Sequence, residues 1–158
     1  MSTHAKASGT RTPGELAVGA EITGPVRLMT AERIEWYDSA MLSAAKGTLA
    51  RVGSNIHTDE AYARSQGLPA IIADGMIMAN WVSSMLVEHF GLAYVERGEL
   101  RTKFIKPVPL GMTVVCRGRV RSAERLAGGA LACVMDVWCE DEHGVKVVDG
   151  HARVELPA

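Results

Sequence analysis

The fold is decided by residues 53–90, which read GSNIHTDEAYARSQGLPAIIADGMIMANWVSSMLVEHF. Residues 76–87 form the longest apolar helix pattern in the chain, and polar residues interrupt it only at Asn80, Ser83 and Ser84. Because a helix that is apolar nearly all round is normally the buried one in its domain, this pattern predicts a central buried helix. Residues 53–90 also hold the tightest cluster of side chains that can do chemistry, namely Asn55, His57, Asp59, Asp74 and Ser83.

Length and composition indicate one globular domain. The chain has 158 residues, of which 47% are hydrophobic and 22% are charged, and it is long enough to bury a core of its own. Residues 1–14 contain many small and polar side chains, so we expect a flexible N-terminal tail followed by a single domain at residues 15–158. The net charge of −1 argues against nucleic acid as a partner, because phosphate binding needs a basic excess.

Targeting and metal-binding patterns are not found in the sequence. It has no window of about 18 apolar residues that could span a membrane, and its start lacks the apolar core of a signal peptide. The three cysteines lie in apolar, strand-like runs without ligand spacing, which favours reduced thiols and no metal site. We therefore expect a cytoplasmic protein without a membrane span.

The remaining chain contains one further long helix pattern and several strand patterns. Thr30 is a typical N-cap for an amphipathic helix that ends near Gly47, and Asp38 on this helix is expected to be solvated. Thr58 is expected to cap a second, short helix that ends at Gly67. Strands are expected at residues 21–29, 99–108, 112–121, 130–140 and 145–156. These elements predict an α+β fold in which a five-stranded antiparallel sheet covers the central helix.

Several local motifs are similar to those of the MaoC-like dehydratases, a family that includes the (R)-specific enoyl-CoA hydratases. The motifs are Ile56-His57-Thr58-Asp59, the helix at 61–63, Ile72-Ala73-Asp74-Gly75-Met76, and Phe104-Ile105-Lys106-Pro107-Val108 followed by Gly111. They occur in the family's order and spacing, and the resemblance covers roughly residues 15–156. It implies a hot-dog fold, in which an antiparallel sheet wraps around one long helix.

The resemblance also implies roles for individual residues. In these enzymes an Asp and a His bind the water that adds to an enoyl thioester, and a backbone N–H at the start of the central helix holds the thioester oxygen. His57 corresponds to the family histidine, Gly75 to the N–H donor, and Ser83 to a helix serine near the acid–base pair. A lone histidine can instead be bonded to the backbone, and Asp59 is expected to cap or charge the short helix.

The catalytic carboxylate of the family is missing from its usual place. An ungapped comparison puts Val52 at the family Asp, and a comparison matched on Asn55 puts Gly53 there. The acid that carrier-protein dehydratases place five residues after the helix glycine is Asn80 here. In contrast, Asp74 stands where the family commonly has histidine. Asp74 is therefore a candidate for a relocated carboxylate, and it can also act as an ordinary N-cap, since capping uses only one oxygen.

Other polar residues have a binding and a structural interpretation. Asn55 and Asn80 can hydrogen-bond a ligand or a water, and a buried amide must find partners. Lys103 and Lys106 alternate along a strand, where they either pair with the phosphates of CoA or phosphopantetheine or form a solvated face. Ser83 either lines the pocket or bonds back to the helix backbone.

Three functions are compatible with these residues. The first is a lyase that hydrates an enoyl thioester or dehydrates a 3-hydroxyacyl thioester, carried on CoA or a carrier protein, without a cofactor and as a homodimer or higher homo-oligomer. The second is a hot-dog thioesterase in which Asp74 activates water, because fold alone does not determine chemistry. The third is a non-catalytic, acyl-thioester-binding partner subunit, which the missing Asp supports. The retained order and spacing of His57 and Gly75 favour the lyase.

Overall fold

The computed structural model describes residues 16–47 and 53–158, so the expected tail at 1–14 and the motif position Val52 lie outside the described residues. The elements of the described chain, in order, are β1 (Glu21–Thr23), β2 (Arg27–Leu28), α1 (Ala31–Lys46), α2 (Glu60–Ser65), α3 (Gly75–Phe90), α4 (Leu92–Arg97), β3 (Gly98–Phe104), β4 (Thr113–Arg125), β5 (Leu131–Asp141) and β6 (Lys146–Leu156).

The strands form one antiparallel sheet of six strands in the order β1-β4-β5-β6-β3, with β2 also paired to β4. The sheet has one strand more than predicted because the expected strand at 21–29 is divided. Ile22 of β1 pairs with Gly118, and Leu28 of β2 pairs with Thr113. Pro25 stands between the two strands and has no N–H to donate, so the hydrogen-bond ladder is interrupted there.

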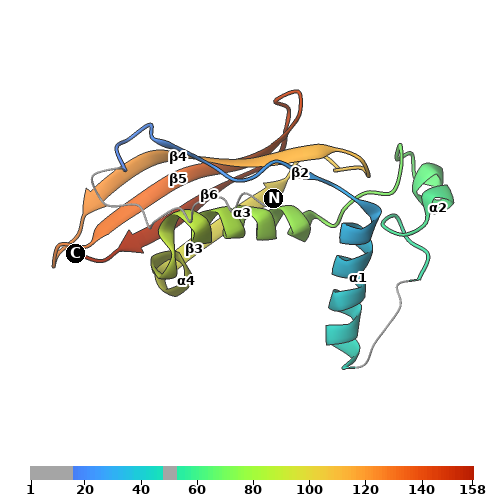
Figure 1. Ribbon diagram of the computed structural model, residues 1–158, viewed down its shortest axis with the longest axis horizontal. Coiled ribbons are helices and arrows are strands. Elements are labelled where there is room, and N and C mark those ends of the chain that lie inside the picture. Colours follow the sequence, from blue (N-terminus) through green and yellow to red (C-terminus); the bar gives the residue numbers. More distant parts are fainter. Residues whose placement is uncertain (1–15, 48–52) are drawn as a thin grey trace, which may run out of the picture.

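Helix α3 runs along one face of the sheet, and α4 lies at the C-terminal end of α3, where it also contacts β6 and β3 (Figure 1). Its buried side chains are Ile77, Met78, Ala79, Val82, Met85, Leu86 and Phe90, and most of them join a core cluster with side chains of β4, β5 and β6. The prediction of a central helix packed on an antiparallel sheet is therefore confirmed. Burial is not complete all round, however, because Met76 and Val87 are 46% and 41% exposed.

Helix α1 has the predicted limits. The Thr30 hydroxyl accepts a hydrogen bond from the Arg33 N–H at 3.3 Å, and the helix ends at Gly47 in the left-handed conformation, with φ +68°. The prediction that Asp38 is solvated is wrong, since this residue is only 8% exposed. Asp38 lies four residues after Ile34, which is buried in the core, and residues four apart share one helix face. The buried face of α1 therefore includes a carboxylate.

The short helix α2 begins one residue later than predicted. Asp59, and not Thr58, is its N-cap, because an Asp59 carboxylate oxygen accepts from the Tyr62 N–H at 2.9 Å. The Thr58 hydroxyl instead donates to the carbonyl of Gly53 at 2.7 Å. Helix α4 has no counterpart among the predicted elements. Among the described helices, none combines the length and the apolarity that a bilayer crossing requires.

Candidate active site

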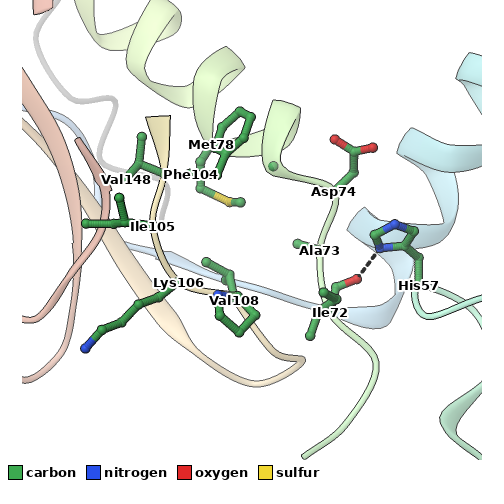
Figure 2. Close-up of a pocket in the computed structure, with 12 residues that line it drawn as sticks. His57, Ile72, Ala73, Asp74, Met78, Phe104, Ile105, Lys106, Val108 and Val148 are labelled. Atoms are coloured by element: carbon green, nitrogen blue, oxygen red, sulfur yellow. Dashed lines mark hydrogen bonds between the residues drawn. The ribbon is translucent and has the colours of Figure 1, made fainter. Parts of the chain in front are cut away.

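A cavity of about 460 Å³ lies where the start of α3 meets the end of β3 (Figure 2). Two backbone hydrogen bonds join the segment before α3 to the chain after β3, from the Ala73 N–H to the Val108 carbonyl at 2.8 Å and from the Leu110 N–H to the Ile71 carbonyl at 2.9 Å. The walls are mainly apolar and include Met78, Phe104, Ile105, Val108 and Val148; His57, Asp74 and Lys106 are the charged or titratable lining residues.

His57 has a defined ring orientation. Its Nδ1 lies 2.7 Å from the backbone oxygen of Ile72, and Figure 2 shows this bond at the edge of the cavity. A carbonyl oxygen only accepts, so Nδ1 carries the proton and donates it. The neutral imidazole then has its lone pair at Nε2, which is the atom able to take a proton. The backbone bond expected of a lone histidine is thus present at Nδ1, and Nε2 has no hydrogen-bond partner among the described residues.

Asn55 builds the loop that holds His57. Its side-chain oxygen accepts from the His57 N–H at 2.7 Å and from the Thr58 N–H at 3.1 Å. A side-chain amide that bonds to the backbone two and three residues later is a typical Asx turn. The oxygen is thus committed to the loop, and Asn55 orients the histidine through its backbone.

Asp74 is the N-cap of α3. One of its carboxylate oxygens accepts from the Met76 N–H at 2.7 Å. The residue is half-buried, and Figure 2 shows its carboxylate above the segment that carries Ile72. Within the described chain, no hydrogen bond joins Asp74 to His57, so both residues border the cavity without forming a direct pair.

Gly75 allows close packing at the first residue of α3. A Cβ added to this glycine would lie 2.7 Å from the ring of Phe104, closer than such contacts occur. The N–H of Gly75 belongs to the first helical turn, whose N–H groups have no acceptor within the helix. Because the N-terminus of a helix carries partial positive charge, this N–H is suited to binding an oxygen that becomes negative.

Asp38 is a residue of this region that sequence reasoning missed. Its Oδ2 is buried, and no group in the described residues donates a hydrogen bond to it. Burial raises the pKa of the Asp38 carboxyl, whereas the charge of His57 lowers it and that of Asp74 raises it. The pKa of the Tyr37 hydroxyl is raised by burial and by the charges of Asp74 and Asp38. The four-residue spacing between Ile34 and Asp38 was the available signal.

The other predicted site residues are dispersed. The Ser83 hydroxyl accepts from the Tyr94 hydroxyl at 3.2 Å, on the side of α3 that faces α4. Asn80 is exposed and borders a second cavity, of about 360 Å³, between α1 and α3. Lys103 borders a separate groove on the sheet, and Lys106 lines the first cavity with its ammonium directed away from His57 (Figure 2).

The structure therefore brings together His57, Asp74, Gly75 and Lys106 around one cavity, and it adds Asp38 beside them. Asn55 supports this group through the loop, while Ser83, Asn80 and Lys103 are not part of it. Among residues 16–47 and 53–158, no three His, Cys, Asp or Glu side chains are grouped as a metal site would require.

Comparison with known proteins supports the resemblance found in the sequence. The family model of the MaoC-like domain matches residues 54–129, which include the His57 loop, α3 and β3. No curated protein matches the chain.

Solved structures with the same fold cover nearly the whole chain. An unliganded (R)-hydratase from Pseudomonas aeruginosa is 22% identical, with a TM-score of 0.65 over 92% of this chain and 84% of that one. A MaoC-like dehydratase from Rhodospirillum rubrum is 16% identical, with a TM-score of 0.70 over 90% and 94%. The 3R-hydroxyacyl-ACP dehydratase complex HadBC from Mycobacterium tuberculosis is 18% identical, with a TM-score of 0.63 over 87% and 96%. The predicted hot-dog fold is thereby confirmed.

Proposed function

We propose, from the MaoC-like domain that this chain carries, that the protein is a lyase that adds water to an enoyl thioester or removes it from a 3-hydroxyacyl thioester. The observation that carries this proposal is the hydrogen bonding of the His57 ring. Its Nδ1 is held by the Ile72 carbonyl, and this leaves Nε2 as a proton acceptor at the edge of an apolar cavity.

The residues of the cavity fit the steps of a hydration. His57 Nε2 removes a proton from water while the water oxygen bonds to C3 of the enoyl group, and the proton is then delivered to C2. Negative charge develops on the thioester oxygen during this step, and the Gly75 N–H at the positive end of α3 stabilises it. The apolar walls, including Met78 and Val148, suit the hydrocarbon part of the acyl group. Because water is only added or removed, no redox cofactor is needed.

Lys106 provides a place for the acyl carrier. It lines the cavity, its side chain is exposed, and it extends away from His57 (Figure 2). An ammonium at the mouth of an acyl pocket can pair with the phosphates of CoA or of phosphopantetheine. We assign the carrier to this side of the cavity and the acyl chain to the apolar side.

Hydrolysis of the thioester is the second candidate function. Asp74 is half-buried beside Gly75, so its free oxygen is placed to activate a water near a carbonyl held by the helix terminus. In that reaction His57 has no direct role, which separates the two candidates experimentally.

We also propose that the protein acts as a homodimer. β3 is the last strand of the sheet order, and its outer edge has no partner strand in the described chain. Helices α3 and α4 also carry exposed apolar side chains, which are Met76, Val87, Leu92 and Val95. A second copy would cover both features.

The test separates the lyase from the thioesterase by two signals that are measured in parallel. Purified protein is incubated with crotonyl-CoA and with longer and aromatic enoyl-CoAs, while enoyl absorbance and free thiol are measured. We expect absorbance to fall without thiol release, and His57→Gln to lower kcat by on the order of 10² to 10⁴. His143→Gln is the matched control, because His143 is exposed in the turn before β6.

Two results would contradict the lyase. Thiol release that persists in His57→Gln and is lost in Asp74→Asn would identify a thioesterase. An inactive wild type on every enoyl thioester, combined with measurable binding of acyl-CoA, would identify a non-catalytic partner subunit.

A further inference from the structure

Asp38 has an unusual environment for a carboxylate in the middle of a surface helix. Most neighbouring positions of α1, including Glu35 and Trp36, are exposed, yet Asp38 is 8% exposed. Its Oδ2 is buried without a hydrogen-bond donor among the described residues. A buried carboxylate without a partner is costly for a folded protein, so it needs an explanation.

The usual structural explanations do not apply to this residue. Asp38 is the eighth residue of α1, so it is too far from the helix start to cap it. The ion pairs found within residues 16–47 and 53–158 do not include it. Neither capping nor pairing with a described cation accounts for its burial.

The position of α1 relates Asp38 to the candidate active site. Figure 2 shows the blue ribbon of α1 beside the His57 ring, and the charges of His57 and Asp74 both act on Asp38. The groups whose charges act on the pKa of Asp38 are His57 from the loop before α2 and Asp74 from the start of α3, and Asp38 in turn raises the pKa of Tyr37 on its own helix. Asp38 therefore belongs to the same group of side chains as the acid–base candidate.

We propose that Asp38 is the carboxylate that works with His57, in place of the acid missing at Val52 or Gly53. In hydration, its Oδ2 accepts a hydrogen bond from one hydrogen of the water, while His57 Nε2 takes the other proton and passes it to C2. In the reverse direction, Oδ2 accepts from the 3-hydroxyl group, and His57 passes the C2 proton to the oxygen of that hydroxyl, which leaves as water. The carboxylate is supplied by α1 and not by the histidine's own loop. This assignment rests on the proposed lyase function, and it competes with Asp74, one of whose oxygens is already used to cap α3.

The first test measures the electrostatic link without any substrate. The ¹³C resonance of the Asp38 carboxyl is titrated in wild type, His57→Gln, Asp74→Asn and the control Glu35→Gln. We expect a midpoint above the ordinary value of 3.8 in wild type, a higher one in His57→Gln and a lower one in Asp74→Asn. Glu35→Gln, an exposed position on the same helix, should leave it unchanged. The proposal would be overturned if the Asp38 carboxyl titrated at the ordinary value and its midpoint did not change in His57→Gln.

The second test measures catalysis and stability together. We expect Asp38→Asn to lower kcat by on the order of 10² with little change in KM, while the thermal midpoint at pH 7 stays equal or rises. Glu35→Gln should stay within about twofold of wild type. The proposal is wrong if Asp38→Asn keeps kcat within about threefold, or if its activity falls only together with its thermal midpoint. If wild type itself is inactive, the lyase function fails, and the carboxyl titration still decides whether Asp38 and His57 act on each other.

Discussion

At the scale of single residues, the site depends on a few side chains whose roles are separated by their hydrogen bonds. The Asn55 side chain accepts a hydrogen bond from the backbone N–H of His57, and the Ile72 carbonyl accepts one from Nδ1 of the His57 ring. Together these two bonds orient His57. Asp74 uses one oxygen to start α3, and Gly75 leaves room for the Phe104 ring. Each of these contacts can be removed by a single substitution, so its effect can be measured separately.

We expect Gly75→Ala to impair the site although it keeps the backbone N–H. The new Cβ would lie 2.7 Å from the Phe104 ring, so the ring or the helix start must move. Overpacking of this kind typically costs about 1–3 kcal/mol of stability. Urea unfolding and kcat/KM measure the effect, and the double variant Gly75→Ala with Phe104→Leu is the control. If the single variant behaves as wild type, the close packing has no functional importance.

The raised pKa of Asp38 predicts how stability depends on pH. The folded protein binds this proton more tightly than the unfolded chain, so wild type loses stability as pH rises from 3.8 through the folded-state pKa. Asp38→Asn does not titrate, so it should be more stable than wild type at pH 7, and the difference should shrink toward pH 4. Urea unfolding at several pH values checks this. An Asn variant that is less stable than wild type at pH 7 would show that the carboxylate is structurally required.

At the scale of secondary-structure elements, the site is assembled from segments that meet only in the folded chain. The loop before α2 supplies His57, the start of α3 supplies Gly75, and the end of β3 supplies Phe104. The sheet behind them is closely packed, and the pairing of β4 with β5 sets Cys116 directly opposite Cys139, with 3.3 Å between their sulfur atoms.

This packing predicts that the cysteines are unreactive in the folded protein. Cys116, Cys133 and Cys139 are all free and buried, and burial raises the pKa of Cys133 to about 11. Because the thiolate is the reactive form and the sulfur atoms are covered, a disulfide reagent at pH 8 should label none of them. Denaturant should release all three thiols. Fast labelling of the folded protein would mean that β4 and β5 open readily.

At the scale of the whole molecule, a strand edge and several apolar side chains are left uncovered within the described residues. The outer edge of β3 has no partner strand in the described chain, and apolar side chains of α3 and α4 are exposed. Open strand edges and exposed apolar surfaces are both typical sites of association. The proposed homodimer would place these two features between its copies.

We therefore expect light scattering after size exclusion to give twice the mass of one chain. Val87→Glu, on the exposed side of α3, should shift the protein toward the monomer, because a charge would be buried between the copies. Val145→Glu is the matched control, since Val145 is an exposed valine in the turn before β6. A wild type that remains monomeric at assay concentrations would contradict the homodimer.

The limits of most elements and part of the site follow from local patterns. Thr30, Gly47 and the apolar run after Gly75 predicted α1 and α3, because caps and helical periodicity depend on neighbours along the chain. His57, Asp74 and Gly75 were predicted together, and they share one cavity. Less local features were missed or misassigned, including the division of the first strand into β1 and β2 and the helix α4.

Thus the amino-acid order alone determines the α+β hot-dog fold and the histidine–glycine pair, since both depend on residue type at fixed spacing. The tertiary structure decides which other polar groups join that pair. It buries Asp38, which looked solvated, and it separates Ser83 and Lys103 from the cavity. The physical reason is that burial and charge interaction depend on neighbours in space, and the packing of α1 beside the His57 loop brings together residues that are distant along the chain.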